Sequence, residues 1–155
     1  MERSLGGRNA LITGSTSGIG LGMALILAKA GAHVMLNGFG RPEDIAAARR
    51  EVGEAMGMAE APYSAADMSK PDEVRQMVAD AQAALGSVDI LINNAGIQHV
   101  CPVEDFPEEK WDAVIAVNLS SAFHATKAAL PGMRARNWGR IINVASAHGK
   151  VASPF

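Results

Sequence analysis

A glycine-rich segment near the amino end is the first place where residue types and spacing could do chemistry. It reads Thr13-Gly14-Ser15-Thr16-Ser17-Gly18-Ile19-Gly20 and directly follows the apolar run 9–12. Glycines let a backbone turn tightly, and the N–H groups at a helix start attract anions such as a pyrophosphate. We therefore predict a phosphate-binding turn, with close helix–strand packing as the alternative use of Gly18 and Gly20. No Gly-Lys-Ser/Thr follows, which excludes a nucleoside-triphosphate loop.

Two polar residues further along, Asn118 and Ser146, also stand where they could take part in a reaction. Asn118 lies three or four residues from Val114, Ile115 and Ala122, so we expect it on the buried stripe of a helix, where an amide needs partners. Ser146 follows an apolar run, at the end of a strand where parallel sheets form ligand sites. The structural alternatives are that Asn118 ties its helix to a strand and that Ser146 caps a turn.

Five short apolar runs must position these residues. Strands are predicted at 9–12, 33–37, 61–65, 88–92 and 140–144, and the first and the last two read as strands buried on both faces. Helical patterns alternate with these runs. Strands joined by crossover helices indicate an α/β fold, a doubly wound parallel sheet with helices on both faces.

Apolar residues at helical spacing predict the connecting helices. The first helix ends near Gly31 and carries Ile19, Met23, Ile26, Leu27 and Ala30. A second helix follows Pro42. The third has Ser69 as its cap and Pro71 in its first turn, and its stripe before Gly86 is Val74, Met77, Val78, Ala81 and Leu85. A long fourth helix runs from about 107 to about 136, with Pro131 kinking or ending it and one face made by Trp111, Val114, Ile115, Ala122 and Ala129.

Composition bounds the function. Among 155 residues, 48% are hydrophobic and 19% charged, and 14 Lys and Arg face 16 Asp and Glu, which describes a globular protein without the basic stripe of a nucleic-acid binder. The single Cys101 permits no internal disulfide and no cysteine-rich metal site, so we expect no metal and a cytoplasmic protein. The uncharged run 9–28 is too rich in Gly, Ser and Thr for a membrane span or secretory signal.

The spacing Thr-Gly-x-x-x-Gly-x-Gly after the first strand resembles the short-chain dehydrogenase/reductase family. Asn93-Asn94-Ala95-Gly96 after the fourth strand, Asn118 in the long helix and Ser146 after the fifth strand match that family's motifs in the same order. The resemblance implies a Rossmann-like fold and a reversible hydride transfer between nicotinamide and a carbinol carbon. It also implies catalytic roles for Asn118 and Ser146.

The same resemblance implies a cofactor site. It assigns the pyrophosphate to Gly14, Thr16, Ser17, Gly18, Ile19 and Gly20, and the rest of the dinucleotide to Phe39, Asp67, Met68, Asn94, Ala95, Gly96 and Val117. The second strand ends at Asn37-Gly38-Phe39, without the acidic residue that commonly holds the ribose of NAD, and Arg41 is near. We expect NAD, with NADP as the alternative.

Longer segments narrow the resemblance within the family. Residues 36–40, 93–99, 104–107 and 139–149 are similar to members that interconvert (R)-3-hydroxybutyrate and acetoacetate, commonly as homotetramers. This implies that Gln98 and His148 bind the carboxylate of a small hydroxy or keto acid. Two alternatives remain: a 3-oxoacyl thioester reductase of the same family, and a non-catalytic dinucleotide-binding module.

The family's Tyr-x-x-x-Lys motif, which supplies the general base, is absent from these residues. The only tyrosine, Tyr63, is followed four positions later by Asp67. Family spacing from Ser146 places the Tyr four positions beyond Phe155. We therefore expect residues 1–155 to form one dinucleotide-binding domain, incomplete at its carboxyl end, that lacks the last strands and helices and is inactive alone.

Overall fold

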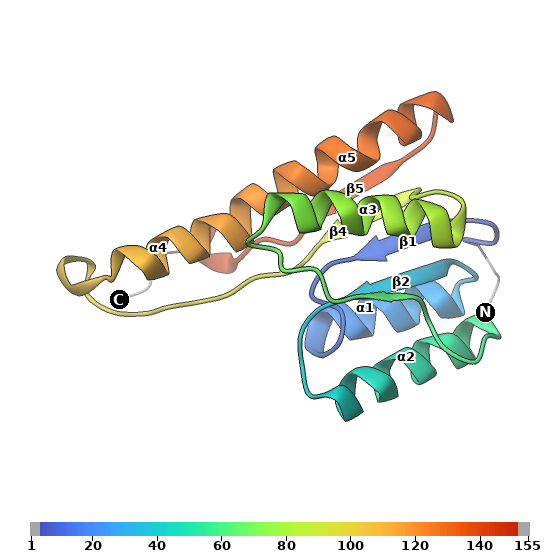
Figure 1. Cartoon of the computed structure of the whole chain (residues 1–155), viewed down its shortest axis with the longest axis horizontal. Coiled ribbons are helices and arrows are strands. Elements are labelled where there is room, and N and C mark those ends of the chain that lie inside the picture. Colours follow the sequence, from blue (N-terminus) through green and yellow to red (C-terminus); the bar gives the residue numbers. More distant parts are fainter. Residues whose placement is uncertain (1–3, 152–155) are drawn as a thin grey trace.

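Five parallel strands form one sheet in the order β3-β2-β1-β4-β5 (Figure 1). The computed structural model describes residues 4–151, so residues 1–3 and 152–155 of the predicted 1–155 domain lie outside the described residues. Strands β1 (Asn9–Ile12) and β2 (His33–Asn37) have the predicted bounds, whereas β4 is Ile90–Asn93 and β5 is Arg140–Asn143. Only Tyr63–Ser64 pair as β3, because Pro62 just before them has no N–H to donate.

The helices cover both faces of the sheet, as predicted. Helices α1 (Gly18–Lys29) and α2 (Pro42–Met56) lie on one face, and α3 (Pro71–Leu85) and α5 (Ser121–Ala135) lie on the other (Figure 1). The strands alternate between the two layers: Ala10 and Ile12 of β1 join the core under α1 and α2, and Leu11 joins the core under α3 and α5. The fold is therefore the predicted doubly wound α/β sheet.

The predicted apolar positions of α1 are confirmed only in part, because Met23 and Leu27 pack against the core and Ile19 and Ile26 do not. The helix buries Gly20, Ala24 and Ala28, while Ile19 and Ile26 are 74% and 62% exposed. This helix is apolar almost all round, so its pattern does not mark a face, and its small residues let it approach the sheet closely. The α3 stripe is confirmed, with Val74, Met77, Val78 and Ala81 buried, but the capping residue is Lys70 and not Ser69.

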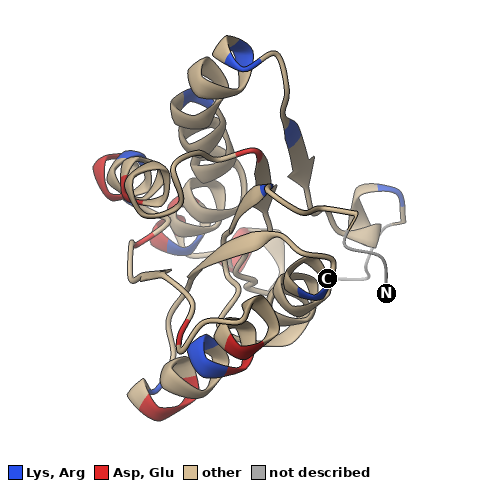
Figure 2. Cartoon of the chain, turned by 90° about the vertical axis from the view of Figure 1, so that its right-hand side faces the viewer, with Lys and Arg blue, Asp and Glu red and all other residues tan. Residues whose placement is uncertain are grey.

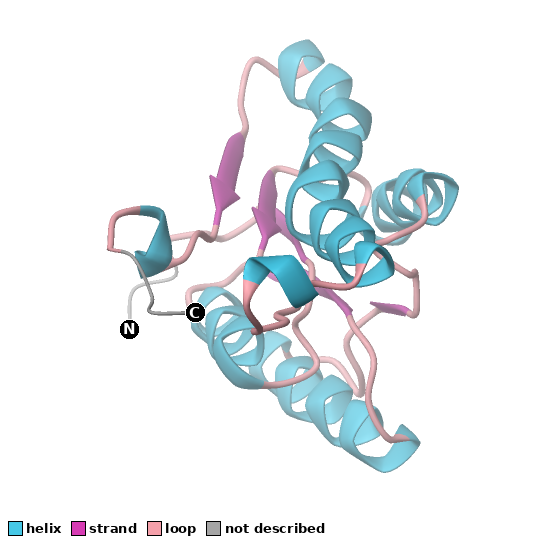
Figure 3. Cartoon of the chain, turned by 90° about the vertical axis from the view of Figure 1, so that its left-hand side faces the viewer, coloured by secondary structure: helices cyan, strands magenta, loops and turns pink. Residues whose placement is uncertain are grey.

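The predicted long helix is two helices joined by a wider turn. Helix α4 (Glu108–Ile115) and α5 flank a π-helical turn at Ala116–Ser120, and Pro131 lies inside α5 without ending it. Helix α4 extends past the edge at which the strands end, so no sheet lies beneath it (Figure 3). Consequently Trp111 is 58% exposed, which corrects its prediction as part of a packed face.

Strand β5 is not buried on both faces as predicted. Among residues 4–151 it pairs with β4 alone, and three of its four residues are exposed because it lies at the edge of the described sheet. Charged side chains of both signs lie mainly on the helices, and the central strands are uncharged (Figure 2). Within residues 4–151, no helix is long and apolar enough to cross a membrane, and no cluster of metal-ligating side chains occurs.

Candidate active site

The glycine turn between β1 and α1 leaves backbone N–H groups free at the carboxyl edge of the sheet. The first bond of α1 runs from Leu21 N to Ser17 O at 3.1 Å, so the N–H groups before it have no partner within the helix. Gly14 and Gly18 have φ of +63° and +55°, which favours glycine. A Cβ on Gly20 would lie 2.2 Å from Gly14 O, so close packing and an open anion site both depend on this turn.

Asn94, after β4, holds the glycine turn in place. Its side-chain amide donates to Thr13 O at 3.0 Å and Gly14 O at 2.9 Å, and its backbone N–H donates to Thr13 Oγ1 at 3.0 Å. A Cβ on Gly14 would lie 2.9 Å from Ala95 Cα, so the two chain segments are in contact. Asn94 therefore fixes the turn against β4 through its side chain.

Asn37, the last residue of β2, makes the matching connection on the other side. It is fully buried; its Oδ1 accepts from Gly14 N at 3.3 Å and its amide donates to Ser64 O and Ala66 O at 3.2 and 3.0 Å. This side chain thus ties β2 to the glycine turn and to the segment after β3. The sequence interpretation assigned it no role, although a polar residue closing an apolar strand was a usable signal.

A pocket of about 180 Å³ lies between these segments. Seven of its lining residues were predicted to bind the dinucleotide, namely Gly14, Phe39, Asp67, Met68, Ala95, Gly96 and Val117. Met68 is buried and Phe39 is 65% exposed, so the pocket has an apolar floor and an aromatic rim. The structure brings these residues together from five separate chain segments. Thr16, Ser17, Gly18, Ile19 and Gly20 do not line it; they form the adjoining turn.

The loop after β2 is pinned from two sides. Tyr63 Oη donates to Gly38 O at 2.7 Å, and Thr16 Oγ1 donates to Phe39 O at 2.9 Å. Burial raises the pKa of Tyr63 above its usual value, outweighing the nearby Arg49, so the phenol stays a donor at neutral pH. On the opposite rim, hydrogen bonds from Ser69 hold the pKa of Asp67 below its usual value and keep it ionised.

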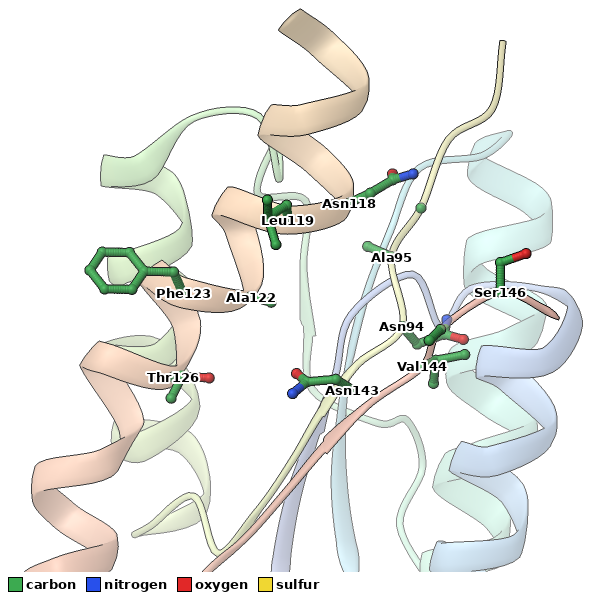
Figure 4. Close-up of a pocket in the computed structure, with 12 residues that line it drawn as sticks. Asn94, Ala95, Asn118, Leu119, Ala122, Phe123, Thr126, Asn143, Val144 and Ser146 are labelled. Carbon is green, nitrogen blue, oxygen red and sulfur yellow. The ribbon is translucent and has the colours of Figure 1, made fainter. Parts of the chain in front are cut away.

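A second and larger cleft, of about 660 Å³, contains both predicted catalytic residues (Figure 4). Ser146 reaches it from the end of β5 and Asn118 from the π-helical turn, while Leu119 and Phe123 form an apolar wall. Ala95 and Gly96 line this cleft and the smaller pocket alike, so the two cavities adjoin. A ligand in the smaller pocket could therefore extend past Gly96 to Ser146.

Asn118 is exposed, which corrects the prediction that it lies on a buried stripe. The π-helical turn places it outside the packed face, where its Oδ1 accepts from Ile97 N and its amide donates to Ile97 O, both at 2.8 Å. The prediction that this amide needs partners is confirmed, and its partner is the loop after β4. Asn118 thereby fixes the backbone that leads from the smaller pocket to Gln98.

The remaining predicted site residues are less closely grouped. Gln98 and His148 are exposed and do not line either cavity. Ser146 Oγ accepts from His148 N at 3.2 Å, so Ser146 also caps the short turn that carries His148. Ser146 thus caps a turn, as the structural alternative predicted, and it also lines the cleft.

Two polar residues that line the cleft, Thr126 and Asn143, were not anticipated, and both lie within hydrogen-bond distance of Asn93. Asn93 donates to Asn143 Oδ1 at 2.8 Å and lies 3.5 Å from Thr126 Oγ1, and its own Oδ1 is buried without a partner among the described residues. Asn93 and Asn143 close β4 and β5, as Asn37 closes β2. Asparagine at the end of three strands was the signal in the sequence that these strands end at a site.

The residues present fit a nicotinamide dinucleotide. Free N–H groups at the start of α1 suit a pyrophosphate, and glycines clear the space beside them. The apolar pocket suits an adenine, and the adjoining cleft leads to Ser146. The arrangement follows the rule that open α/β sheets bind ligands beyond the carboxyl ends of their strands.

Comparison with known proteins agrees with this geometry. Residues 8–155 match the family model for short chain dehydrogenases. The chain belongs to the short-chain dehydrogenase family. Members of this family bind a nicotinamide dinucleotide. Our expectation from the sequence motifs is thus confirmed, and with it the Rossmann-like fold.

Two curated relatives in this family are D-beta-hydroxybutyrate dehydrogenases. The one from Cupriavidus necator is 58% identical over 149 residues, which is 96% of this chain and 57% of the relative. The one from Rhizobium meliloti is 54% identical over 148 residues, again 96% of this chain and 57% of the relative. The chain therefore spans somewhat more than half the length of these relatives.

Solved structures of family members resemble the chain closely. A metagenomic short-chain oxidoreductase in complex with NADP superposes with a TM-score of 0.88 at 36% identity, covering 97% of this chain and 67% of that one. An NAD⁺-bound xylitol dehydrogenase gives a TM-score of 0.87 at 35% identity, covering 97% and 57%. Both forms of the dinucleotide thus occur among structural neighbours.

Proposed function

We propose that the protein containing these residues is an NAD-dependent dehydrogenase that interconverts (R)-3-hydroxybutyrate and acetoacetate. The observation that carries the proposal is the continuity of the dinucleotide pocket with the cleft of Ser146 and Asn118, in a chain 58% identical to a D-beta-hydroxybutyrate dehydrogenase. When bound, the dinucleotide supplies the hydride acceptor or donor. In this proposal residues 1–155 form one dinucleotide-binding domain, and the whole protein is a cytoplasmic homotetramer.

In this proposal the chain's own residues hold and orient the substrate. The Ser146 hydroxyl, at the end of β5, hydrogen-bonds the reacting oxygen, and Gln98 and His148 bind the carboxylate. Asn118 positions the loop that carries Gln98 through its two bonds to Ile97. The general base, by the family resemblance, is a Tyr four positions beyond Phe155, with its pKa lowered by a Lys.

The pyrophosphate contacts are proposed to be backbone N–H groups of the turn Thr16–Gly20. Gly14 leaves room beside them, and Asn94, Ala95 and Gly96 lie along the path toward the cleft. Phe39, Asp67, Met68 and Val117 enclose the adenosine end. Holding one ligand by both cavities would place its reactive end next to Ser146.

A substrate comparison on the whole protein tests this function. We expect NADH oxidation with acetoacetate and little with an acetoacetyl thioester. The reverse preference would replace the proposal by a 3-oxoacyl thioester reductase. Tight NADH binding without turnover of either compound would indicate a non-catalytic module.

A further inference from the structure

Two residues beyond Phe39, which forms the rim of the smaller pocket, lies an arginine whose charge is already engaged. Phe39 lines the pocket, and Arg41 follows two residues later as the capping residue of α2. An arginine in this position is the type of residue that accommodates the 2′-phosphate of NADP. The sequence alone therefore leaves NADP open as the cofactor.

Both carboxylates in the first turn of α2 hold this guanidinium. Arg41 Nε and Nη2 contact the two oxygens of Asp44 at 2.8 and 3.0 Å, and Nη1 lies 3.4 Å from Glu43 Oε1. A guanidinium group paired in this bidentate way has few N–H donors left for another anion. A 2′-phosphate would have to displace two carboxylates that also repel it.

Gly38, the residue after β2, leaves no room for a carboxylate side chain. Gly38 has a φ of +151°, and a Cβ there would lie 2.6 Å from Thr16 Oγ1, the atom that holds Phe39 O. Tyr63 fixes the same loop through Gly38 O. An aspartate in place of Gly38 would therefore disrupt the loop, so a carboxylate at this position is not the source of discrimination against a phosphate.

The opposite rim is organised in the same way. Lys70 Nζ lies 2.9 Å from Glu73 Oε1 and 3.8 Å from Asp67 Oδ2, and Asp67 lines the pocket. In the segments that follow Phe39 and Asp67, two cations are thus each held by two carboxylates. The local charge favours a dinucleotide without the additional phosphate.

We propose that Glu43 and Asp44 determine dinucleotide specificity by engaging Arg41 and adding negative charge at the rim, so that the protein selects NAD over NADP. This inference rests on the proposed function, because it needs a dinucleotide in the pocket. The ion pairs are exposed, with side-chain exposures of 73% for Arg41 and 53% for Asp44, so the effect is moderate and sensitive to salt.

Binding of NADH and NADPH to the whole protein, measured by titration calorimetry at low ionic strength, tests the proposal. The wild type is expected to bind NADH about tenfold or more tightly than NADPH. In Glu43→Gln/Asp44→Asn, the released Arg41 should tighten NADPH binding by about tenfold while NADH binding changes little. This gain should shrink at high salt.

Two matched variants isolate the cause. Adding Arg41→Gln to the double variant should remove most of the gain, and Glu54→Gln/Glu60→Gln, which removes two charges elsewhere, should give none. The proposal is overturned by equal affinities in the wild type, by no gain in the double variant, or by the same gain without Arg41. Failure of the wild type to bind either dinucleotide would instead overturn the proposed function together with this inference.

Discussion

At the scale of single residues, Ser146 is the predicted catalytic residue that the end of β5 positions in the cleft. Ser146 lines the large cleft shortly after β5, and the only hydrogen bond of its hydroxyl within the described residues is the one accepted from His148 N at 3.2 Å. The proton of the hydroxyl is therefore available to a substrate oxygen. In the proposed reaction this donor stabilises the oxygen on which charge changes.

Replacement of Ser146 by alanine should lower kcat in the whole protein by about 10²–10³-fold, the usual effect of removing such a donor. NADH affinity should stay nearly constant, because Ser146 does not line the dinucleotide pocket. Stopped-flow kinetics and NADH titration measure the two effects. Ser146→Thr, which keeps a hydroxyl, should recover part of the rate. A loss of NADH affinity in Ser146→Ala, with kcat unchanged, would assign Ser146 a structural role.

The grouping of several predicted site residues was readable from the sequence, but their surroundings were not. Ser146 and Asn118 were predicted to share a site, and one cleft contains both. The exposure of Asn118 could not be foreseen, since helical periodicity assumes a regular helix and the π-helical turn shifts the residue off the packed face. Asn37 was missed because its partners lie 23 to 29 residues away.

At the scale of elements, Gly20 at the start of α1 allows both close packing of the helix and an open anion site. Gly20 permits the close approach of α1 to Gly14 O, while Gly22, two residues along, has nothing within 4 Å of where a Cβ would lie. The periodic pattern of large apolar residues predicted the helix, but only Met23 and Leu27 among the large residues it named pack against the core. The buried residues of the helix are the small Gly20, Ala24 and Ala28, which the pattern leaves out.

Two glycine substitutions in α1 should therefore have opposite signs. Gly20→Ala should destabilise the protein by more than about 2 kcal/mol and weaken NADH binding, because the methyl group collides with backbone. Gly22→Ala should stabilise it by about 0.5–1 kcal/mol, the gain in helix propensity. Chemical denaturation gives both values. Equal effects of the two substitutions would show that the close contact at Gly20 is unimportant.

At the scale of the whole molecule, a buried ion pair ties the far ends of the elements together. Asp89, just before β4, has a side chain only 6% exposed; it accepts from Asn9 N at 3.1 Å and from Arg136, after α5, at 3.1–3.2 Å. Arg136 also donates to Val88 O at 2.9 Å. This contact sets α5, and with it Asn118, relative to β1 and β4.

Arg136→Gln should lower the free energy of unfolding by about 1–3 kcal/mol, because it leaves a buried carboxylate without its cation. Arg75→Gln is the control: its partner Asp72 is 95% exposed, so its loss should cost less than about 0.5 kcal/mol. Denaturant titration compares the two. Similar losses for both variants would contradict a tying role for Asp89 and Arg136.

The layering followed from the sequence because apolar runs and crossover helices leave few alternatives, whereas the strand order comes from the structure. The exposure of β5 could not be predicted from the sequence, because an apolar run such as Ile141-Ile142 occurs in central and edge strands alike. Nor does the extent of α4 beyond the sheet follow from periodicity. Both features depend on what packs beside an element, which local sequence does not encode.

The central claim is direct hydride transfer from a 3-hydroxy acid to a dinucleotide held at this edge of the sheet. Its most direct measurement uses (R)-3-hydroxybutyrate carrying deuterium at C3, with NAD⁺ and the whole protein, and mass spectrometry of the NADH formed. The account predicts one deuterium in each NADH and acetoacetate in equal amount. NADH without deuterium, or no reaction while NAD⁺ binds, would contradict it.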